Sequence, residues 1–126
     1  MTQEEKELLK DLCARLDTNL VCSIYRTDDE GVGYRDEILH GYCKGDIWYE
    51  FYFREDCSIS MDNVSKIKPY LFPLSSITKK RLEELSEYID IKNAYVAVEI
   101  LNSHHIDYRG LIEKGLAIDA TGLNIY

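Results

Sequence analysis

Residues 47–54 alternate strictly between two sets of side chains, and this pattern limits the fold more than any other stretch of the chain. Alternate residues of a β-strand point to opposite faces, so each set belongs to one face. The two sets are Ile47, Tyr49, Phe51 and Phe53, and Trp48, Glu50, Tyr52 and Arg54. Because the first set is largely apolar, the sequence predicts a sheet with at least one covered face.

Residues 2–16 predict an amphipathic helix that covers this face. Thr2 and Glu5 have the spacing of a capping box, in which each side chain caps the backbone N–H of the other residue. An apolar stripe follows at helical spacing and consists of Leu8, Leu9, Leu12, Cys13 and Leu16.

Three further strands are predicted beside the alternating one. They cover residues 20–25, 34–42 and 57–61, with a polar, glycine-bearing loop over 27–33. Because the gaps between the strands are short, we expect an antiparallel meander of three or four strands.

The second half of the chain predicts connectors and helices. Residues 62–77 are interpreted as a connector, because Pro69 and Pro73 interrupt regular structure. A second helix is predicted to begin at Ser75, Ser76 or Thr78 and to run to about Ile89.

Residues 92–105 fit a strand or a helix, and their length and polar end favour a helix. Asp107 then resembles the N-cap of a short helix over 108–114, which Gly115 would close as its C′ residue. The predicted fold of residues 1–126 is therefore one α+β domain. It has an N-terminal helix, a three- to four-stranded antiparallel meander and two to three C-terminal helices.

Composition excludes several classes of partner. The 126 residues carry a net charge of −8, and residues 1–60 contribute most of it. An acidic surface disfavours nucleic acids and anionic membranes as partners. The chain has no run of about 18 apolar residues and no apolar leader, so a cytoplasmic protein is expected.

The four cysteines, at positions 13, 22, 43 and 57, form no Cys-x-x-Cys pair. Each lies in an apolar or strand-like context. We therefore expect buried reduced thiols rather than disulfides.

Residues 101–117 hold the densest set of reactive side chains. His104, His105 and Asp107 are types that bind metals, but adjacent histidines on a helix point about 100° apart. No third ligand is identifiable by spacing, so we predict no metal and no cofactor. Arg109 offers a planar fork for a carboxylate or phosphate, although it can also pair with Glu113 four residues on.

Two other features suggest binding surfaces. The strand face with Trp48 and Tyr52 is either exposed and able to bind a partner, or covered by later helices. The sequence leaves both interpretations open. A basic stretch over 64–82 contains no acid and carries Lys66, Lys68, Lys79, Lys80 and Arg81. It could contact an anionic partner or the acidic part of a second copy.

Three segments resemble an uncharacterised family of small proteins from Bacteroides and related gut bacteria and their mobile elements. They are Met1–Leu16, Lys68–Thr78 and Leu101–Ala117, about a third of the chain. After Thr78 the chain departs from the family, because similar proteins often continue with acidic residues where this one has Lys79, Lys80 and Arg81. The resemblance implies no known activity and no catalytic residues.

The function that these observations favour is protein interaction without catalysis, in an accessory protein of a gut bacterium or its mobile element. The partner is another protein or a second copy in a homodimer, with no nucleic acid and no membrane. The predicted binding residues are Trp48, Tyr52, Asp107, Tyr108 and Arg109. The alternative is a small-molecule binding protein or hydrolase, whose cleft would be lined by His104, His105, Asp107 and Arg109.

Overall fold

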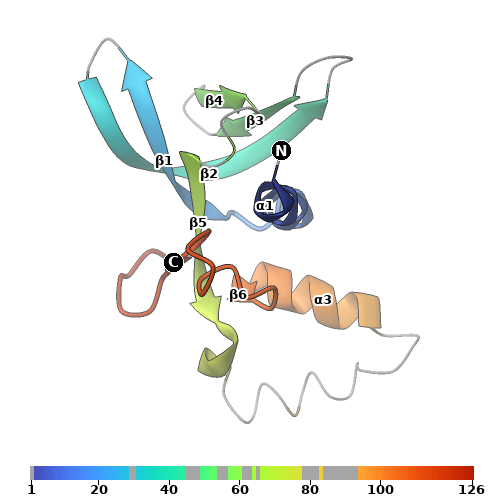
Figure 1. Cartoon of the computed structure of the whole chain (residues 1–126). Helices are drawn as coiled ribbons and strands as arrows, with labels where there is room; N and C mark the ends of the chain where they lie inside the picture. The colour runs from blue at the N-terminus through green and yellow to red at the C-terminus, as the bar shows by residue number, and fades with distance from the viewer. Residues whose placement is uncertain are drawn as a thin grey trace.

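The computed structural model describes residues 2–28, 31–44, 49–53, 57–60, 64, 66–77, 83 and 94–126. Within these ranges the chain forms two α-helices and seven strands of one mixed sheet. In Figure 1 both helices lie to the right of strand β5, while the β1–β2 hairpin extends to the upper left.

Helix α1 spans Gln3–Ala14 and begins as the sequence predicts. Thr2 Oγ1 accepts a hydrogen bond from the Glu5 backbone N–H (3.1 Å), and Glu5 Oε1 accepts one from the Thr2 backbone N–H (3.3 Å). This reciprocal capping box satisfies two N–H groups that a helix start otherwise leaves without partners. Leu8 and Leu12 from the predicted stripe are fully buried.

Four consecutive strands form the antiparallel part of the sheet. They are β1 (Val21–Asp28), β2 (Gly31–Lys44), β3 (Tyr49–Phe53) and β4 (Cys57–Ser60). Each pairs antiparallel with the next, as expected for a meander. The predicted loop over 27–33 is wrong at both ends, because β1 runs to Asp28 and β2 begins at Gly31.

Strand β5 (Ile67–Pro73) lies where the sequence predicts a connector. It pairs antiparallel with β1, and Pro69 lies opposite Cys22. Proline is compatible with such a ladder at a position where its missing N–H would point away from the neighbouring strand. Ile67, Pro69 and Leu71 are buried and alternate with more exposed residues, as in a strand with one covered face.

Two short strands pair with β5 in parallel: β6 (Ile106–Asp107) and β7 (Ile118–Asp119). The Phe72 N–H donates to His105 O, and Leu71 O accepts from the Ala120 N–H, each at 2.8 Å. These two groups of β5 belong to one trans peptide and point in opposite directions. Therefore β6 and β7 lie at opposite edges of β5.

The predicted fold class is wrong in the second half of the chain. The sheet order is β4-β3-β2-β1-β5-β6 with β7 also on β5, a mixed sheet larger than a three- to four-stranded meander. The prediction of two to three C-terminal helices fails as well. One α-helix, α3 (Ala94–Ser103), and a 3₁₀ turn, η2 (Leu74–Ser76), lie between β5 and β6 in the chain within the described residues.

Helix α3 decides the ambiguity of residues 92–105 in favour of a helix. The predicted helix from Ser75, Ser76 or Thr78 to about Ile89 falls mostly on residues outside the described ranges. The predicted short helix over 108–114 is wrong. Residues 108 and 109 form bends, Gly110 with φ +73° interrupts helical geometry, and hydrogen-bonded turns occupy 111–115.

One hydrophobic core joins α1, the sheet and the C-terminal turns. Its buried members are Leu8, Leu12, Leu20, Cys22, Ile24, Leu39, Phe51, Phe53, Val64, Ile67, Leu71, Leu111 and Ala117. Phe51 and Phe53 lie on the face that the alternation predicts to be covered. Burying each large side chain contributes roughly 1.5–3 kcal/mol, so this cluster is the main stabilising feature of the fold.

The described cysteine side chains are free thiols, as predicted. Cys22 is fully buried in the core and Cys13 is partly buried. Burial raises the pKa of both thiols, which disfavours the reactive thiolate. The side chains of Cys43 and Cys57 lie outside the described part of the structure. None of the described helices is long and apolar enough to cross a membrane.

Candidate functional site

A buried ion pair lies between α1 and the segment that is densest in reactive side chains. Arg15 donates to both oxygens of Asp11, from Nε (2.9 Å) and Nη2 (3.1 Å), and both side chains are fully buried. Arg15 Nη2 also donates to Ile106 O in β6, at 2.6 Å. Burial raises the pKa of Asp11, and the ion pair with Arg15 opposes that shift. The pair therefore links α1 to β6.

Tyr108 and Arg109 complete this cluster. Arg109 Nε lies 3.3 Å from Asp11 Oδ1, so the carboxylate has a second cationic neighbour. The Cζ atoms of Arg15 and Arg109 each lie 5.2 Å from the centre of the Tyr108 ring, within the range of cation–π attraction. The Tyr108 hydroxyl donates to Asn102 Oδ1 at 2.8 Å. Tyr108 and Arg109 thus hold the turn after β6 against α1 and α3.

Asp107 has the capping role that the sequence predicts, although it caps a turn. Its two carboxylate oxygens accept from the Leu111 and Ile112 N–H groups, each at 2.9 Å. Gly115 closes the same turn with φ +74°. Its N–H donates to Ile112 O and the next N–H donates to Leu111 O, the pattern of a Schellman motif with glycine at C′. Gly115 therefore has the predicted C′ geometry, but it ends a turn and not the predicted helix.

The two histidines separate, as the sequence predicts. His104 is exposed, whereas His105 is buried in a left-handed conformation with φ +59°. The His105 ring stacks on Tyr126 with centroids 3.8 Å apart and planes at 13°. Burial, then the charges of Arg15 and His104, lowers the pKa of His105 to about 4. Within the described residues, no three His, Cys, Asp or Glu side chains could together hold a metal ion.

Tyr126 fastens the end of this segment to the sheet. Its hydroxyl accepts from the Val21 N–H (3.0 Å) and donates to Tyr70 O (2.8 Å). It therefore bridges β1 and β5 where the pairing of these strands ends. The ring also packs against Phe72, at 5.9 Å between centroids.

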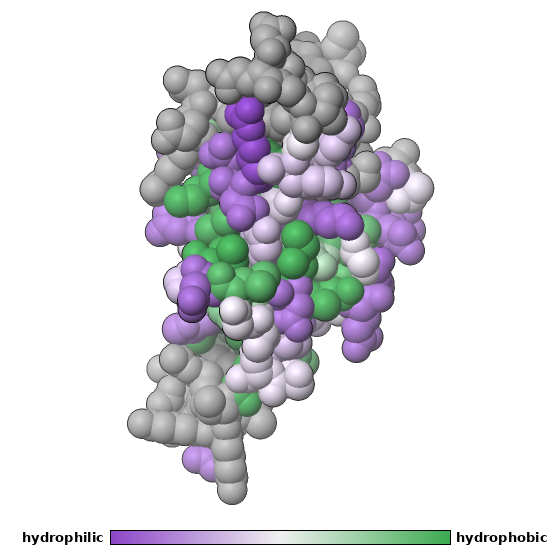
Figure 2. Space-filling view, turned by 90° about the vertical axis from the view of Figure 1, so that its left-hand side faces the viewer, coloured by the Kyte–Doolittle hydropathy of each residue, from purple (hydrophilic) through white to green (hydrophobic). Residues whose placement is uncertain are grey.

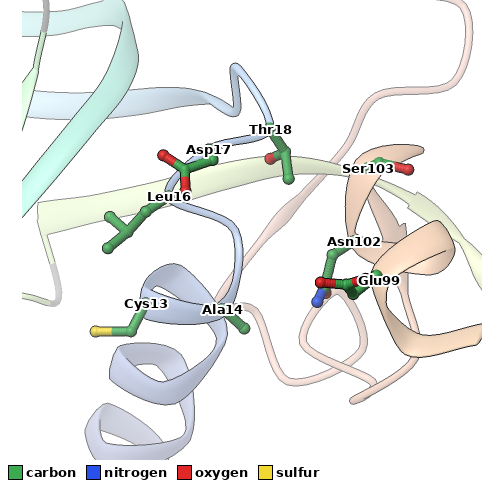
Figure 3. Close-up of a pocket in the computed structure, with 8 residues that line it drawn as sticks. All are labelled: Cys13, Ala14, Leu16, Asp17, Thr18, Glu99, Asn102 and Ser103. Carbon is green, nitrogen blue, oxygen red and sulfur yellow. The ribbon is translucent and has the colours of Figure 1, made fainter. Parts of the chain in front are cut away.

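A pocket of about 420 Å³ lies between the end of α1 and α3 (Figure 3). It is lined by Cys13, Ala14, Leu16, Asp17, Thr18, Glu99, Asn102 and Ser103. Figure 3 shows Glu99 and Asn102 projecting from α3 toward α1. The side chains predicted for the alternative cleft, His104, His105, Asp107 and Arg109, do not line this pocket.

The structure describes four of the five predicted binding residues, Tyr52, Asp107, Tyr108 and Arg109. Asp107, Tyr108 and Arg109 lie together, but Asp107 is buried and the other two are half-buried. Tyr52 lies in β3 and donates to Glu50 Oε2 at 2.9 Å. Trp48 falls outside the described residues, so the question of an exposed Trp48 face stays open.

Sequence reasoning missed a second cluster, on the sheet face opposite the core. We call it the tyrosine face, and it consists of Ser23, Tyr25, Tyr34, Asp36, Lys66, Lys68 and Tyr70. Tyr25 pairs with Tyr34 across β1 and β2, with ring centroids 5.1 Å apart in an edge-to-face arrangement. Lys66 Nζ lies 5.9 Å from the Tyr25 ring centre. Tyr34 is 68% exposed.

Tyr70 crosses this face and orders it. Its hydroxyl donates to Asp36 Oδ1 at 2.7 Å, across the intervening Ser23 of β1, which is only 6% exposed. Burial and the hydrogen bond to Asp36 raise the pKa of Tyr70. Figure 2 views the side of the molecule away from the helices, where hydrophobic and hydrophilic residues are interspersed.

One signal for each missed feature is present in the sequence. Asp11 and Arg15 continue the buried helical face of Leu8 and Leu12, at spacings of three and four residues. The tyrosine face follows a two-residue period on both sides of the β1–β2 hairpin. Because residues 27–33 were interpreted as a loop, the register between the two strands was not recognised, and Tyr25 was not placed opposite Tyr34.

The chain matches no protein-family model, no curated protein and no solved structure in our comparisons. The resemblance to the Bacteroides family therefore stays a prediction.

Proposed function

We propose that this chain is a protein-interaction module that binds its partner through the tyrosine face. The observation that carries this proposal is the Tyr25–Tyr34 pair, which lies on the sheet face opposite the core with Tyr34 68% exposed. An accessory role in a gut bacterium or its mobile element stays a prediction that rests on the resemblance alone.

Tyrosine suits a binding surface for two physical reasons. Its ring supplies a large contact area, and its hydroxyl supplies a hydrogen bond at the rim of that area. It also loses little conformational entropy on binding, because it has only two side-chain torsions. Here Tyr70 is already held by Asp36, and Tyr25 by Tyr34 and Lys66. Such ordering before binding lowers the entropic cost of association.

The charges of the face favour a protein partner over a polyanion. Two lysines and one aspartate are interspersed with the tyrosines, while the whole chain carries −8. Phosphate backbones are bound by surfaces with many more cationic groups. A protein surface can instead match both signs of charge and the aromatic area together.

The alternative function, small-molecule binding or hydrolysis at His104, His105, Asp107 and Arg109, has less support. Three of these side chains are engaged in holding the fold together, through the Tyr126 stack, the capped turn and the Asp11 ion pair. We therefore base no function on them.

A photo-crosslinking residue placed at Tyr34 tests the proposal. Expressed in its source cell and irradiated, this variant should form covalent adducts with a protein, either another chain or a second copy. The matched control carries the same residue at Leu123, which is 49% exposed, lies in the C-terminal turn and is not one of the seven residues of this face. Adducts at position 34 that are no more abundant than those at position 123 would contradict the proposal.

A further inference from the structure

We infer that the partner of the tyrosine face is a second copy of this chain, related by a two-fold axis that runs along β1. This inference rests on the proposed function and names its partner. It follows from the positions of the charged side chains on the face, with Asp36 on β2 and Lys66 and Lys68 on the β5 side.

Six of the seven residues of the tyrosine face lie in two rows across β2, β1 and the β5 side, and Tyr70 reaches from β5 to Asp36 in the first row. Ser23 pairs with Asp36 on one side and with Lys68 on the other, so these three residues form the first row. Tyr25 pairs with Tyr34. The antiparallel pair Ile24–Ile67 places Lys66 on the other side of Tyr25, in agreement with the 5.9 Å between Lys66 Nζ and the Tyr25 ring. Each row thus has a cation on the β5 side only.

A two-fold axis along β1 matches these rows to each other. It stacks the two faces, keeps each row at the same position along the strands, and exchanges the β2 side for the β5 side. Asp36 of one copy then lies opposite Lys68 of the second copy, and Tyr34 lies opposite Lys66. The first contact is an ion pair and the second a cation–π contact, and each forms twice. Stacking of two sheets with nearly aligned strands is a common packing geometry.

The groups needed for these contacts are accessible. Asp36 is exposed although Tyr70 donates to its Oδ1, and a carboxylate has a second oxygen that can accept from a lysine. Lys66 is exposed and Lys68 is half-exposed. Two copies with −8 each repel one another at long range. The tyrosine face carries two cations and one anion, so it is a surface on which two copies can approach.

A charge-exchange experiment with full-length chains tests this arrangement. Asp36→Lys and Lys68→Glu each place like charges opposite one another twice, so each variant alone should dimerise about tenfold more weakly than wild type or worse. An equimolar mixture should recover dimers, because the lysine introduced at position 36 of the first variant then meets the glutamate introduced at position 68 of the second. Sedimentation equilibrium measures the dissociation constants, and circular dichroism confirms that each variant is folded.

Matched controls separate this pairing from the effect of net charge. Glu113→Lys and Lys10→Glu change exposed residues outside the tyrosine face by the same amounts of charge. They should change dimerisation little, and mixing them should produce no recovery. If the two face variants dimerise like wild type, or if their mixture does not recover, the inference is wrong.

A measurement on the chain without charge variants gives a second test. The photo-crosslinking residue at Tyr34 should form adducts with a second copy, and mass spectrometry should locate the other end of the link near Lys66. A wild-type chain that stays monomeric up to hundreds of micromolar would overturn the inference. If Tyr34 then crosslinks to a different protein, the proposed function stands and only the second copy is excluded.

Discussion

The Asp11–Arg15 pair shows how single residues can join distant parts of this fold. Both side chains are fully buried, and the guanidinium also bonds Ile106 O, 91 residues away along the chain. A buried ion pair gains little net stability over an apolar pair, because desolvation offsets the attraction. Replacing only one of the two charged side chains is costly, because the other charge then stays in the core without its main partner.

We predict that Arg15→Met destabilises the protein by about 3–5 kcal/mol, because the Asp11 carboxylate stays buried without its bidentate partner. The double variant Asp11→Leu with Arg15→Met should recover much of that loss. Urea unfolding followed by circular dichroism measures both. Lys10→Met, an exposed change in the same helix, is the control and should stay within about 0.5 kcal/mol of wild type. A double variant no more stable than Arg15→Met would contradict this account.

At the scale of elements, short polar motifs were readable from the sequence and pairing between distant strands was not. The capping box of α1 and the C′ geometry of Gly115 depend on neighbouring residues, and both are found as predicted, although Gly115 ends a turn. Strand β5 contains two prolines, and local rules interpret these as breaks. The strand forms because β1 on one edge and the β6 and β7 backbones supply its partners.

The turn after β6 allows a direct test of the role of local conformation. Gly115 has φ +74°, and a Cβ added there would meet no atom within 4 Å. We therefore expect Gly115→Ala to cost about 1–2 kcal/mol through backbone strain alone, and Gly115→Asn to cost less.

Gly33→Ala is the matched control, because Gly33 also has open space but lies in β2 without a positive φ. This change should be neutral or slightly stabilising. Thermal unfolding of the three variants measures the difference. An equal loss of stability at positions 33 and 115 would contradict this account, because only Gly115 has a positive φ.

At the scale of the whole molecule, His105 and Tyr126 attach the C-terminal segment to the sheet: their rings stack, and the Tyr126 hydroxyl bonds β1 and β5. The stack of these two rings is coupled to the protonation of His105. The folded-state pKa of His105, about 4, lies below its ordinary value of 6.5, so the folded state favours the neutral ring. Nδ1 of His105 is buried without a hydrogen-bond partner among the described residues, which also disfavours a second N–H.

We predict that this coupling makes the fold less stable in acid. The contribution of His105 is complete above about pH 6.5 and is lost as the pH falls toward 4, by up to about 1.4 kcal/mol per pH unit. His105→Asn should remove this pH dependence, because asparagine does not titrate and tolerates the left-handed conformation. Free energies of unfolding measured from pH 7.5 to 4 provide the test.

The exposed His40 provides the control for this experiment. His40→Gln should keep the wild-type loss of stability between pH 6.5 and 4. If His105→Asn and wild type lose stability in parallel over this range, the carboxylates rather than His105 control the acid response.

Local signals in the chain were sufficient for the start and buried stripe of α1, the covered face of β3, the separation of the two histidines and the capping roles of Asp107 and Gly115, though not for the turn between them. Long-range packing was needed to make residues 67–73 a central strand. It was also needed to bring Arg15 to β6 and to gather tyrosines from β1, β2 and β5 on one face. The physical reason is that strand partners and buried charge pairs are selected by contacts between residues far apart in the chain, and the periodic pattern within one segment does not identify its partner segment.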